Sequence, residues 1–260
     1  MLRCPLRCTP AGSHLVSSRA RQAAPLASST LYTPQEKRGM TVTAASTADN
    51  DKVLHLMRHG QTEMNVFLRR HYDRNGNHAL LPHEDPMMID TRLTAEGKEQ
   101  ARCKQSEVLE LDPRPELVVF SPLSRAIETG QLAFAGLPDV PRTVTPLATE
   151  KVWYGADLGR SPSELAKDFP DLDLSDLPEV FWYTGKDGNP SKPVDEPERV
   201  FVRRIEQLRD WLAARPEKSI ALVAHWGVLK VLSGRSFDNC EIHTTTVSKL
   251  AIGDKNGLYI

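Results

Sequence analysis

The stretch Val53-Leu54-His55-Leu56-Met57-Arg58-His59-Gly60 begins as a short β-prone run and ends in a basic pair followed by glycine. Two further apolar runs, LVVFS at 117–121 and SIALVA at 219–224, have the length and composition of strands that are buried on both faces. The last of these runs is followed directly by His225. The three runs predict strands of one sheet, with polar side chains where the strands end.

Apolar residues at helical spacing separate these strands. The pattern predicts helices over 94–110, from Pro122 to about residue 134, over 195–214 and directly after His225. Thr94 is expected to cap the first helix. The buried face of the 195–214 helix is expected to consist of Val200, Ile205, Leu208, Trp211 and Leu212. Strands that alternate with helices predict an α/β fold, a three-layer sandwich whose mainly parallel sheet has helices on both faces.

Two shorter runs and two long segments remain. Residues 144–148 and 247–252 are expected to be strands. Residues 64–92 are polar, and residues 170–194 are rich in Pro, Asp and Gly, so both segments are expected to be irregular loops. Loops of this length on an α/β core are commonly functional.

Each of these three strands leads to a cation or a potential cation. The first ends at Arg58 and His59, the second leads into Arg125, and the third ends at His225. Because ligands of open α/β folds bind at the carboxyl edge of the sheet, these four side chains are expected to form one site. Two arginines and two histidines suit a dianion, and phosphate is the obvious candidate. The helix that opens after Ser121 is expected to add free N–H groups.

A histidine in such a site can also be the nucleophile. Neutral imidazole attacks phosphorus without a base, provided that the attacking nitrogen is bare and the other ring nitrogen donates to a carbonyl. Cationic side chains then stabilise the charge on the equatorial oxygens. This chemistry requires no metal or other cofactor, and none is predicted, since Cys103 and Cys240 stand in no metal-ligand spacing.

Four segments, in order along the chain, resemble motifs of the histidine phosphatase superfamily, also called the phosphoglycerate mutase-like family. They are LMRHGQTEMN at 56–65, Arg92-Leu93-Thr94 with Gly97 and Gln100-Ala101, SPLSRAIET at 121–129, and VAHWGV at 223–228. The resemblance covers about residues 53 to 250. It implies the phosphoglycerate mutase-like fold, with His59 as the phosphorylated residue. It also implies a phosphate-binding set that consists of Arg58, Arg125 and His225, with Thr62 and Asn65 at positions that support the pocket.

The family also supplies a carboxylic acid that gives a proton to the leaving alkoxide. Glu150, which follows the predicted strand at 144–148, occupies the matching place and is expected to be catalytic with His59. Asp157 is the alternative, within a segment at 156–161 that resembles a phosphoglycerate mutase-like subgroup of plants, algae and bacteria. Asn239-Cys240-Glu241 also resembles this subgroup, but the residues themselves indicate no chemical role.

The candidate site residues predict a metal-independent phosphatase, a phosphoric monoester hydrolase that acts on a small phosphorylated metabolite. Glycolytic phosphoglycerate mutases resemble one another through a tryptophan in the signature and an Asn-Glu-Arg-x-Tyr-Gly segment. This chain has Met64 at the tryptophan position and nothing like the second segment, so a mutase-type phosphotransferase is the alternative. A non-catalytic phosphate-binding protein on the same fold is a second alternative, which the filled catalytic positions disfavour.

The first 50 residues differ in charge from the rest of the chain. They carry six Lys or Arg and two acidic residues, a net charge of +4, whereas the whole chain has a formal net charge of −1. The first 35 residues contain no acidic residue and are rich in Arg, Ser and Ala, a composition typical of a transit peptide. Residues 1–50 are therefore expected to be a disordered segment that targets a plastid or mitochondrion, and residues 51–260 the catalytic domain. Without such targeting the protein is expected to be cytoplasmic.

The acidic main body disfavours a nucleic-acid partner, and no apolar run has the length of a membrane span. The expected partner is the small phosphorylated substrate, and the sequence does not indicate an oligomeric state. Segment 67–78 follows the nucleophile motif and contains Arg69, Arg70, His71, Arg74 and His78. This positive charge either recognises a second anionic group of the substrate or belongs to a solvated loop.

Overall fold

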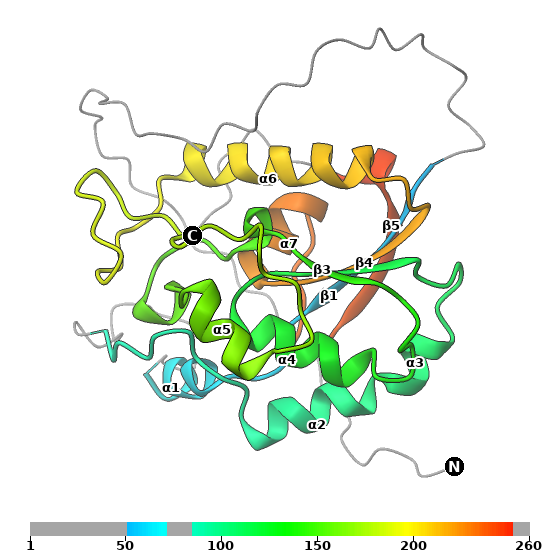
Figure 1. Ribbon diagram of the computed structural model, residues 1–260, viewed down its shortest axis with the longest axis horizontal. Helices are drawn as coiled ribbons and strands as arrows, with labels where there is room; N and C mark the ends of the chain where they lie inside the picture. The colour runs from blue at the N-terminus through cyan, green and yellow to red at the C-terminus, as the bar shows by residue number, and fades with distance from the viewer. Residues whose placement is uncertain (1–50, 72–84, 252–260) are drawn as a thin grey trace, which may run out of the picture.

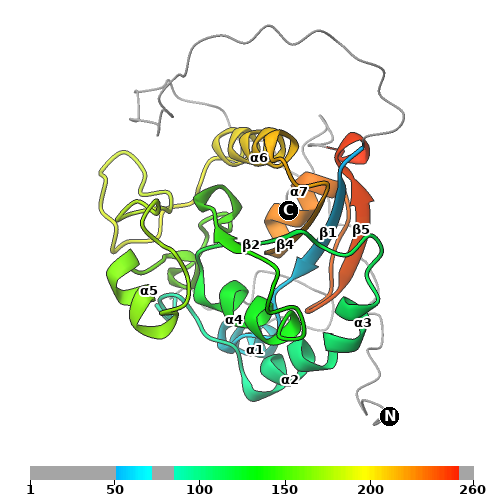
Figure 2. The ribbon, with the colours of Figure 1, turned by 45° about the vertical axis from the view of Figure 1, so that its right-hand side comes forward.

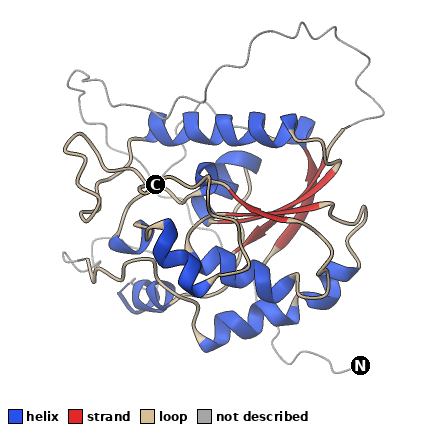
Figure 3. Ribbon diagram, viewed as in Figure 1, coloured by secondary structure: helices blue, strands red, loops and turns tan. Residues whose placement is uncertain are grey.

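The computed structural model describes residues 51–71 and 85–251, and within them the chain forms a five-stranded sheet with helices on both sides (Figures 1 and 3). The strands are β1 (Val53–Arg58), β2 (Leu117–Phe120), β3 (Arg142–Val144), β4 (Ser219–Ala224) and β5 (Ile242–Thr246). Their order is β3-β2-β4-β1-β5; the first four in this order are parallel, and β5 is antiparallel to β1. The predicted fold class is confirmed. The predicted transit segment lies outside the described residues.

Side chains of the three central strands point alternately into two cores. One face carries Leu54 and Leu56 of β1, Leu117 and Val119 of β2, and Ile220 and Leu222 of β4. The opposite face carries Met57, Val118, Phe120, Ala221 and Val223. Because both faces are buried, these strands are apolar at nearly every position, which is the pattern that predicted them.

Helices cover the two faces as separate layers (Figure 2). Helices α6 (Glu198–Ala214) and α7 (Trp226–Ser233) pack on the first face, and α2 (Ala95–Cys103), α3 (Gln105–Leu109) and α4 (Ser124–Ala133) on the second. Four residues of α6 are buried, each contributing about 2 kcal/mol relative to exposure: Phe201, Ile205, Leu208 and Leu212. Val200 and Trp211, expected on this face, are half-buried. None of the helices in the described ranges has the length and apolar composition that a membrane crossing requires.

The helix predicted over 94–110 is two helices, α2 and α3. Thr94 caps α2 as expected, since its hydroxyl accepts a bond from Gly97 N–H at 3.0 Å. The N–H of Lys104 donates to Ala101 O, three residues back, so the last turn of α2 tightens and the helix ends. The next helix, α4, begins at Ser124, two residues after the proline that predicted its start.

Two predicted strands are misplaced. Residues expected in the last strand begin with η4 (Val247–Lys249), a 3₁₀ turn, and β5 precedes it. The β5 side chains are mostly half-buried at the sheet edge, so this strand lacks a continuous apolar run. The strand predicted at 144–148 overlaps β3 only at residue 144, and η2 (Pro146–Ala148) occupies most of the rest. The strand does not continue because Pro146 has no N–H to donate to a neighbouring strand.

The segment predicted as one irregular loop over 64–92 contains most of a helix, α1 (Glu63–His71). Residues 72–84, with Arg74 and His78, lie outside the described residues. The turn η3 (Gly155–Asp157) and α5 (Pro162–Asp168) precede the second segment, 170–194, which is irregular as predicted. That segment packs on the α4 side of the core through Leu172, Leu174, Leu177 and Phe181.

Candidate active site

His59 lies directly after β1 and is 4% exposed. Its Nδ1 is 2.7 Å from Gly60 O, and because a carbonyl oxygen only accepts, Nδ1 carries the proton and Nε2 is bare. Burial lowers the pKa of His59 well below 6.5, and the charges of Arg125 and Arg58 lower it further. His59 is therefore a neutral imidazole with the lone pair that a nucleophile needs.

Arg58, the last residue of β1, is half-buried and supplies a positive charge beside His59. Burial lowers the pKa of its guanidinium to about 10, so it remains cationic at neutral pH. One guanidinium nitrogen, Nη1, donates to Phe237 O at 2.6 Å. Among the described residues the Nε of Arg58 has no acceptor although it is buried. An unsatisfied charged donor in a cavity wall favours an anionic ligand.

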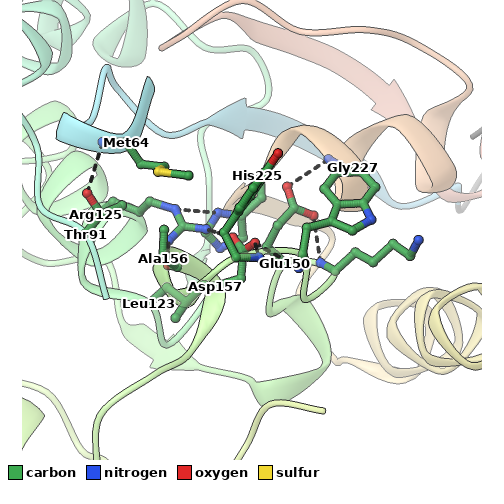
Figure 4. Close-up of polar contacts among 12 residues, drawn as sticks. Met64, Thr91, Leu123, Arg125, Glu150, Ala156, Asp157, His225 and Gly227 are labelled. Carbon is green, nitrogen blue, oxygen red and sulfur yellow. Dashed lines mark hydrogen bonds and ion pairs between the residues drawn. The ribbon is translucent and has the colours of Figure 1, made fainter. Parts of the chain in front are cut away.

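Arg125 lies in the first turn of α4, and its guanidinium is held at three points (Figure 4). Nη1 donates to Ala156 O at 2.6 Å, and Nη2 forms an ion pair with Asp157 Oδ1 at 2.9 Å. Nε donates to His225 Nδ1 at 3.3 Å. The segment around η3 thus sets the orientation of this arginine.

His225, the residue before α7, is fully buried, and its ring centroid lies 5.2 Å from that of His59. Because its Nδ1 accepts from Arg125, its proton is on Nε2, which donates to Ser121 Oγ at 2.7 Å. Burial lowers the pKa of His225 well below 6.5. Both ring nitrogens are thus engaged by protein groups in this state.

The start of α4 differs from the expectation of free N–H groups. Leu123 N–H donates to Ser121 Oγ at 3.3 Å, and Ser124 N–H donates to Asp90 Oδ1 at 2.8 Å. The prediction is wrong for these two groups, because a serine and a buried aspartate satisfy them.

Glu150 is buried after η2, and its carboxylate accepts two backbone bonds. Oε2 accepts from Gly227 N–H at 3.0 Å, and Oε1 accepts from Lys151 N–H at 2.9 Å. Burial raises the pKa of Glu150, and the negative charge of Asp157 raises it further. A glycine at 227 permits this approach, since a Cβ there would meet Glu150 Oε1 at 2.4 Å.

Asp157, the alternative proton donor, is also buried but differs in its partners. Besides its bond to Arg125, its Oδ2 accepts from Trp153 and Tyr154 N–H at 3.1 Å each. Burial raises the pKa of Asp157, while Arg125 and the backbone donors act in the opposite direction.

Thr62 and Asn65 cap the start of α1 reciprocally. Thr62 N–H donates to Asn65 Oδ1 at 3.2 Å, and Asn65 N–H donates to Thr62 Oγ1 at 3.1 Å. A cavity of about 770 Å³ is lined by both residues and by Arg58, His59, Arg125, Glu150 and Asp157. The same cavity is also lined by Met64, Leu68, Thr91, Lys151, Trp153, Tyr154, Ala156, Asp195 and Trp226. His225 supports this wall through Arg125.

A family model described as the histidine phosphatase superfamily (branch 1) matches residues 54–257. The chain belongs to this superfamily. A Schizosaccharomyces pombe protein named "Probable phosphatase" is 29% identical over 184 residues, covering 67% of this chain and 74% of that protein. The Arabidopsis thaliana "Phosphoglycerate mutase-like protein" is 29% identical over 224 residues, covering 73% of this chain and 77% of that protein. The chain is a phosphatase-type enzyme of the histidine phosphatase superfamily.

Solved structures of other proteins resemble this chain at lower sequence identity. The ecdysone phosphate phosphatase of Bombyx mori, in complex with tungstate, is 18% identical with a TM-score of 0.49, covering 80% of this chain and 98% of that one. The alpha-ribazole phosphatase of Shigella flexneri is 23% identical with a TM-score of 0.46, covering 78% and 100%. Similarity at this level does not bear on the substrate.

Sequence reasoning missed residues that hold the candidate active site in place. Arg204 of α6 donates to the carbonyls of Leu147 and Thr149, just ahead of Glu150, and is itself paired with Glu196 at 2.7 Å. An arginine on a helix is normally solvated, so nothing in the sequence distinguished Arg204 from its neighbours. In residues 51–71 and 85–251, no cluster of three or more His, Cys, Asp or Glu could hold a metal ion.

Proposed function

We propose that this protein is a metal-independent phosphatase that hydrolyses the phosphate monoester of a small metabolite through a phosphohistidine at His59. One observation carries the proposal: neutral His59 has a bare Nε2 and lines a cavity together with Arg58 and Arg125. A nucleophile beside two cations suits a phosphate dianion, whose charge the arginines stabilise during transfer.

In the proposed first step, the lone pair of His59 Nε2 attacks phosphorus, and the bond between phosphorus and the ester oxygen breaks. The departing oxygen takes the proton of Glu150, so the product leaves as a neutral alcohol. In the second step, water attacks phosphorus and gives a proton to Glu150, while the P–N bond breaks and inorganic phosphate leaves. Gly60 O holds the Nδ1 proton of His59 throughout.

The part of the cavity lining that lies outside the candidate catalytic residues would receive the organic group of the substrate. Trp153 and Trp226 offer apolar rings there, and Lys151 lies over the Trp153 ring at 4.8 Å. Lys151 also pairs with Asp195 at 3.3 Å, so this wall carries both signs of charge. A small polar metabolite fits such a wall better than a long acyl chain does.

The test compares the full-length wild type with His59→Asn in the presence of a metal chelator, on nitrophenyl phosphate and on a panel of phosphometabolites. The wild type should release inorganic phosphate and form an acid-labile phosphoenzyme, and His59→Asn should do neither. His243→Asn, on β5 and outside the cavity lining, is the matched control and should keep full activity. Substantial turnover by His59→Asn, or a wild type that isomerises substrates without releasing phosphate, would contradict the proposal.

A further inference from the structure

The turn at 237–241, between α7 and β5, contains the Asn239-Cys240-Glu241 motif that the proposed mechanism does not use. This turn lies against the end of β1. The Arg58 guanidinium donates to Phe237 O at 2.6 Å, and Arg58 N–H donates to Glu241 O at 3.2 Å. Cys240 N–H donates back to Arg58 O at 3.0 Å. The turn therefore binds the backbone and the side chain of the residue that precedes the nucleophile.

The side chain of Asn239 reaches the nucleophile's own backbone. Its Nδ2 donates to His59 O at 2.9 Å. At the other edge of the same peptide, Gly60 N–H donates to Thr129 Oγ1 at 2.9 Å, and the Thr129 hydroxyl donates to Arg125 O at 2.7 Å. The peptide that joins His59 to Gly60 is thus held on both edges, by Asn239 and by the helix that carries Arg125.

This peptide adjoins the carbonyl that determines the tautomer of His59. His59 Nδ1–H donates to Gly60 O at 2.7 Å. The peptide is planar, so a rotation of the unit between His59 and Gly60 would turn Gly60 and move its carbonyl away from the ring. The ring could then carry its proton on Nε2, which has to be bare for attack.

The amide orientation of Asn239 follows from its partners. Besides His59 O, its Nδ2 lies 3.4 Å from Asn65 Oδ1, and that oxygen accepts from Thr62 N–H. Both neighbours of the amide nitrogen are acceptors, so the NH₂ group and not the carbonyl faces them. Asn239 therefore also connects the nucleophile to the first turn of α1.

Backbone strain occurs in the same turn. Cys240 has a φ of 59°, in the left-handed region that residues other than glycine rarely adopt. It is 1% exposed, and its Sγ lies close to Gly60, where an added Cβ would meet it at 3.2 Å. Strained residues persist where the surrounding structure over-determines them, commonly at functional sites. The left-handed Cys240 directs its N–H to Arg58 O at 3.0 Å and, at 3.4 Å, to His59 O, the carbonyl that also accepts the shorter bond from Asn239.

We infer that Asn239 is a positioning residue for the nucleophile: its amide holds the His59–Gly60 peptide in the orientation that keeps the His59 proton on Nδ1 and leaves Nε2 bare. The kinetic consequence of this role rests on the proposed function. Its effect on the tautomer does not, because the ring proton of His59 can be located whether or not the protein hydrolyses a phosphate ester.

The kinetic test uses Asn239→Leu, which keeps the branching of the side chain and removes the donor without adding charge. Because misorientation of a reacting group is costly, kcat for nitrophenyl phosphate should fall roughly 10- to 100-fold, with KM nearly unchanged. Glu241→Gln is the matched control. The Glu241 carboxylate accepts from Asp238 N–H at 2.8 Å and from Arg235 at 2.9 Å, so it supports the same turn without contacting His59. This control should lower the Tm and leave kcat unchanged.

The structural test is the ¹⁵N NMR spectrum of the His59 ring, assigned by comparison with His59→Asn. The wild type and Glu241→Gln should show a protonated Nδ1, whereas Asn239→Leu should show protonation of Nε2. An unchanged tautomer in Asn239→Leu, or an equal fall of kcat in Glu241→Gln, would overturn the positioning role. If the wild type hydrolyses no phosphate ester, the proposed function fails, and the tautomer in Asn239→Leu still decides the role of Asn239.

Discussion

Glu150 and Asp157 are both buried carboxylates in the wall of one cavity, and burial raises the pKa of both. Their partners differ. Glu150 accepts from the backbone N–H groups of Lys151 and Gly227, and the charge of Asp157 raises its pKa further. Asp157 is ion-paired with Arg125, which opposes the effect of burial on its pKa.

The difference teaches that burial alone does not assign a role to a carboxylate. The negative charge of Asp157 adds to the effect of burial and raises the pKa of Glu150, whereas Arg125 acts against the effect of burial on the pKa of Asp157 and is oriented by that carboxylate. We therefore expect Glu150 to be the proton donor and Asp157 to be an anchor for Arg125. The following experiments test that division, beginning with the largest expected effect.

Replacing Glu150 with Gln should reduce the rate for an alkyl phosphate by roughly 10²–10⁴-fold, because the departing alkoxide then leaves without a proton. The loss should be much smaller for nitrophenyl phosphate, whose leaving group needs no proton. The measurement is kcat for both substrates. Equal losses on the two would remove the acid role from Glu150.

Asp157→Asn should reduce kcat/KM by about tenfold on both substrates, because Arg125 loses its ion pair but keeps the bond to Ala156 O. The measurement is kcat/KM for an alkyl phosphate and for nitrophenyl phosphate, which shows whether the loss depends on the leaving group. A selective loss on the alkyl phosphate would show that Asp157, and not Glu150, donates the proton.

The pH dependence of kcat/KM should separate the two carboxylates as well. Glu150 has to be protonated to donate, so activity on an alkyl phosphate should be highest below its raised pKa and should fall as pH rises through it. This basic limb should disappear in Glu150→Gln. It should move to lower pH in Asp157→Asn, because a negative charge that raises the Glu150 pKa is removed. A limb that persists in Glu150→Gln belongs to another group.

His59 should contribute no acid limb near pH 6.5, because burial and the two arginines hold its pKa well below that value.

The smallest effect is expected from Arg69 and Arg70 of α1, where neither carboxylate is involved. Arg69 lines a recess of about 250 Å³ together with Arg58, Asn65, Leu68, Asp238 and Asn239. Exchanging Arg69 and Arg70 for Gln should raise KM a few-fold for a phosphometabolite with a second anionic group and leave nitrophenyl phosphate hydrolysis unchanged. Arg70→Gln alone is the control, since Arg70 does not line this recess. Unchanged kinetics on both substrates would leave the charge without a role in recognition.

Sequence reasoning succeeded where a pattern is local. The central strands β1, β2 and β4 are buried on both faces, so each is a continuous apolar run that can be read directly. The edge strand β5 was misplaced by several residues because its half-buried side chains form no such run. Helix α1 was missed because its residues are mostly polar or half-buried, and its reciprocal cap by Thr62 and Asn65 became visible only in the fold.

The sequence by itself determined that Arg58, His59 and His225 lie at one edge of the sheet, because each ends or follows a strand that parallel pairing aligns. Tertiary structure alone decided which groups these residues bind. Gly227 and Glu150 are 77 residues apart in the chain, and Asn239 and His59 are 180 apart. No local pattern encodes a bond between a side chain and a distant backbone group. Such bonds depend on how loops pack, and loop packing is set by the whole fold.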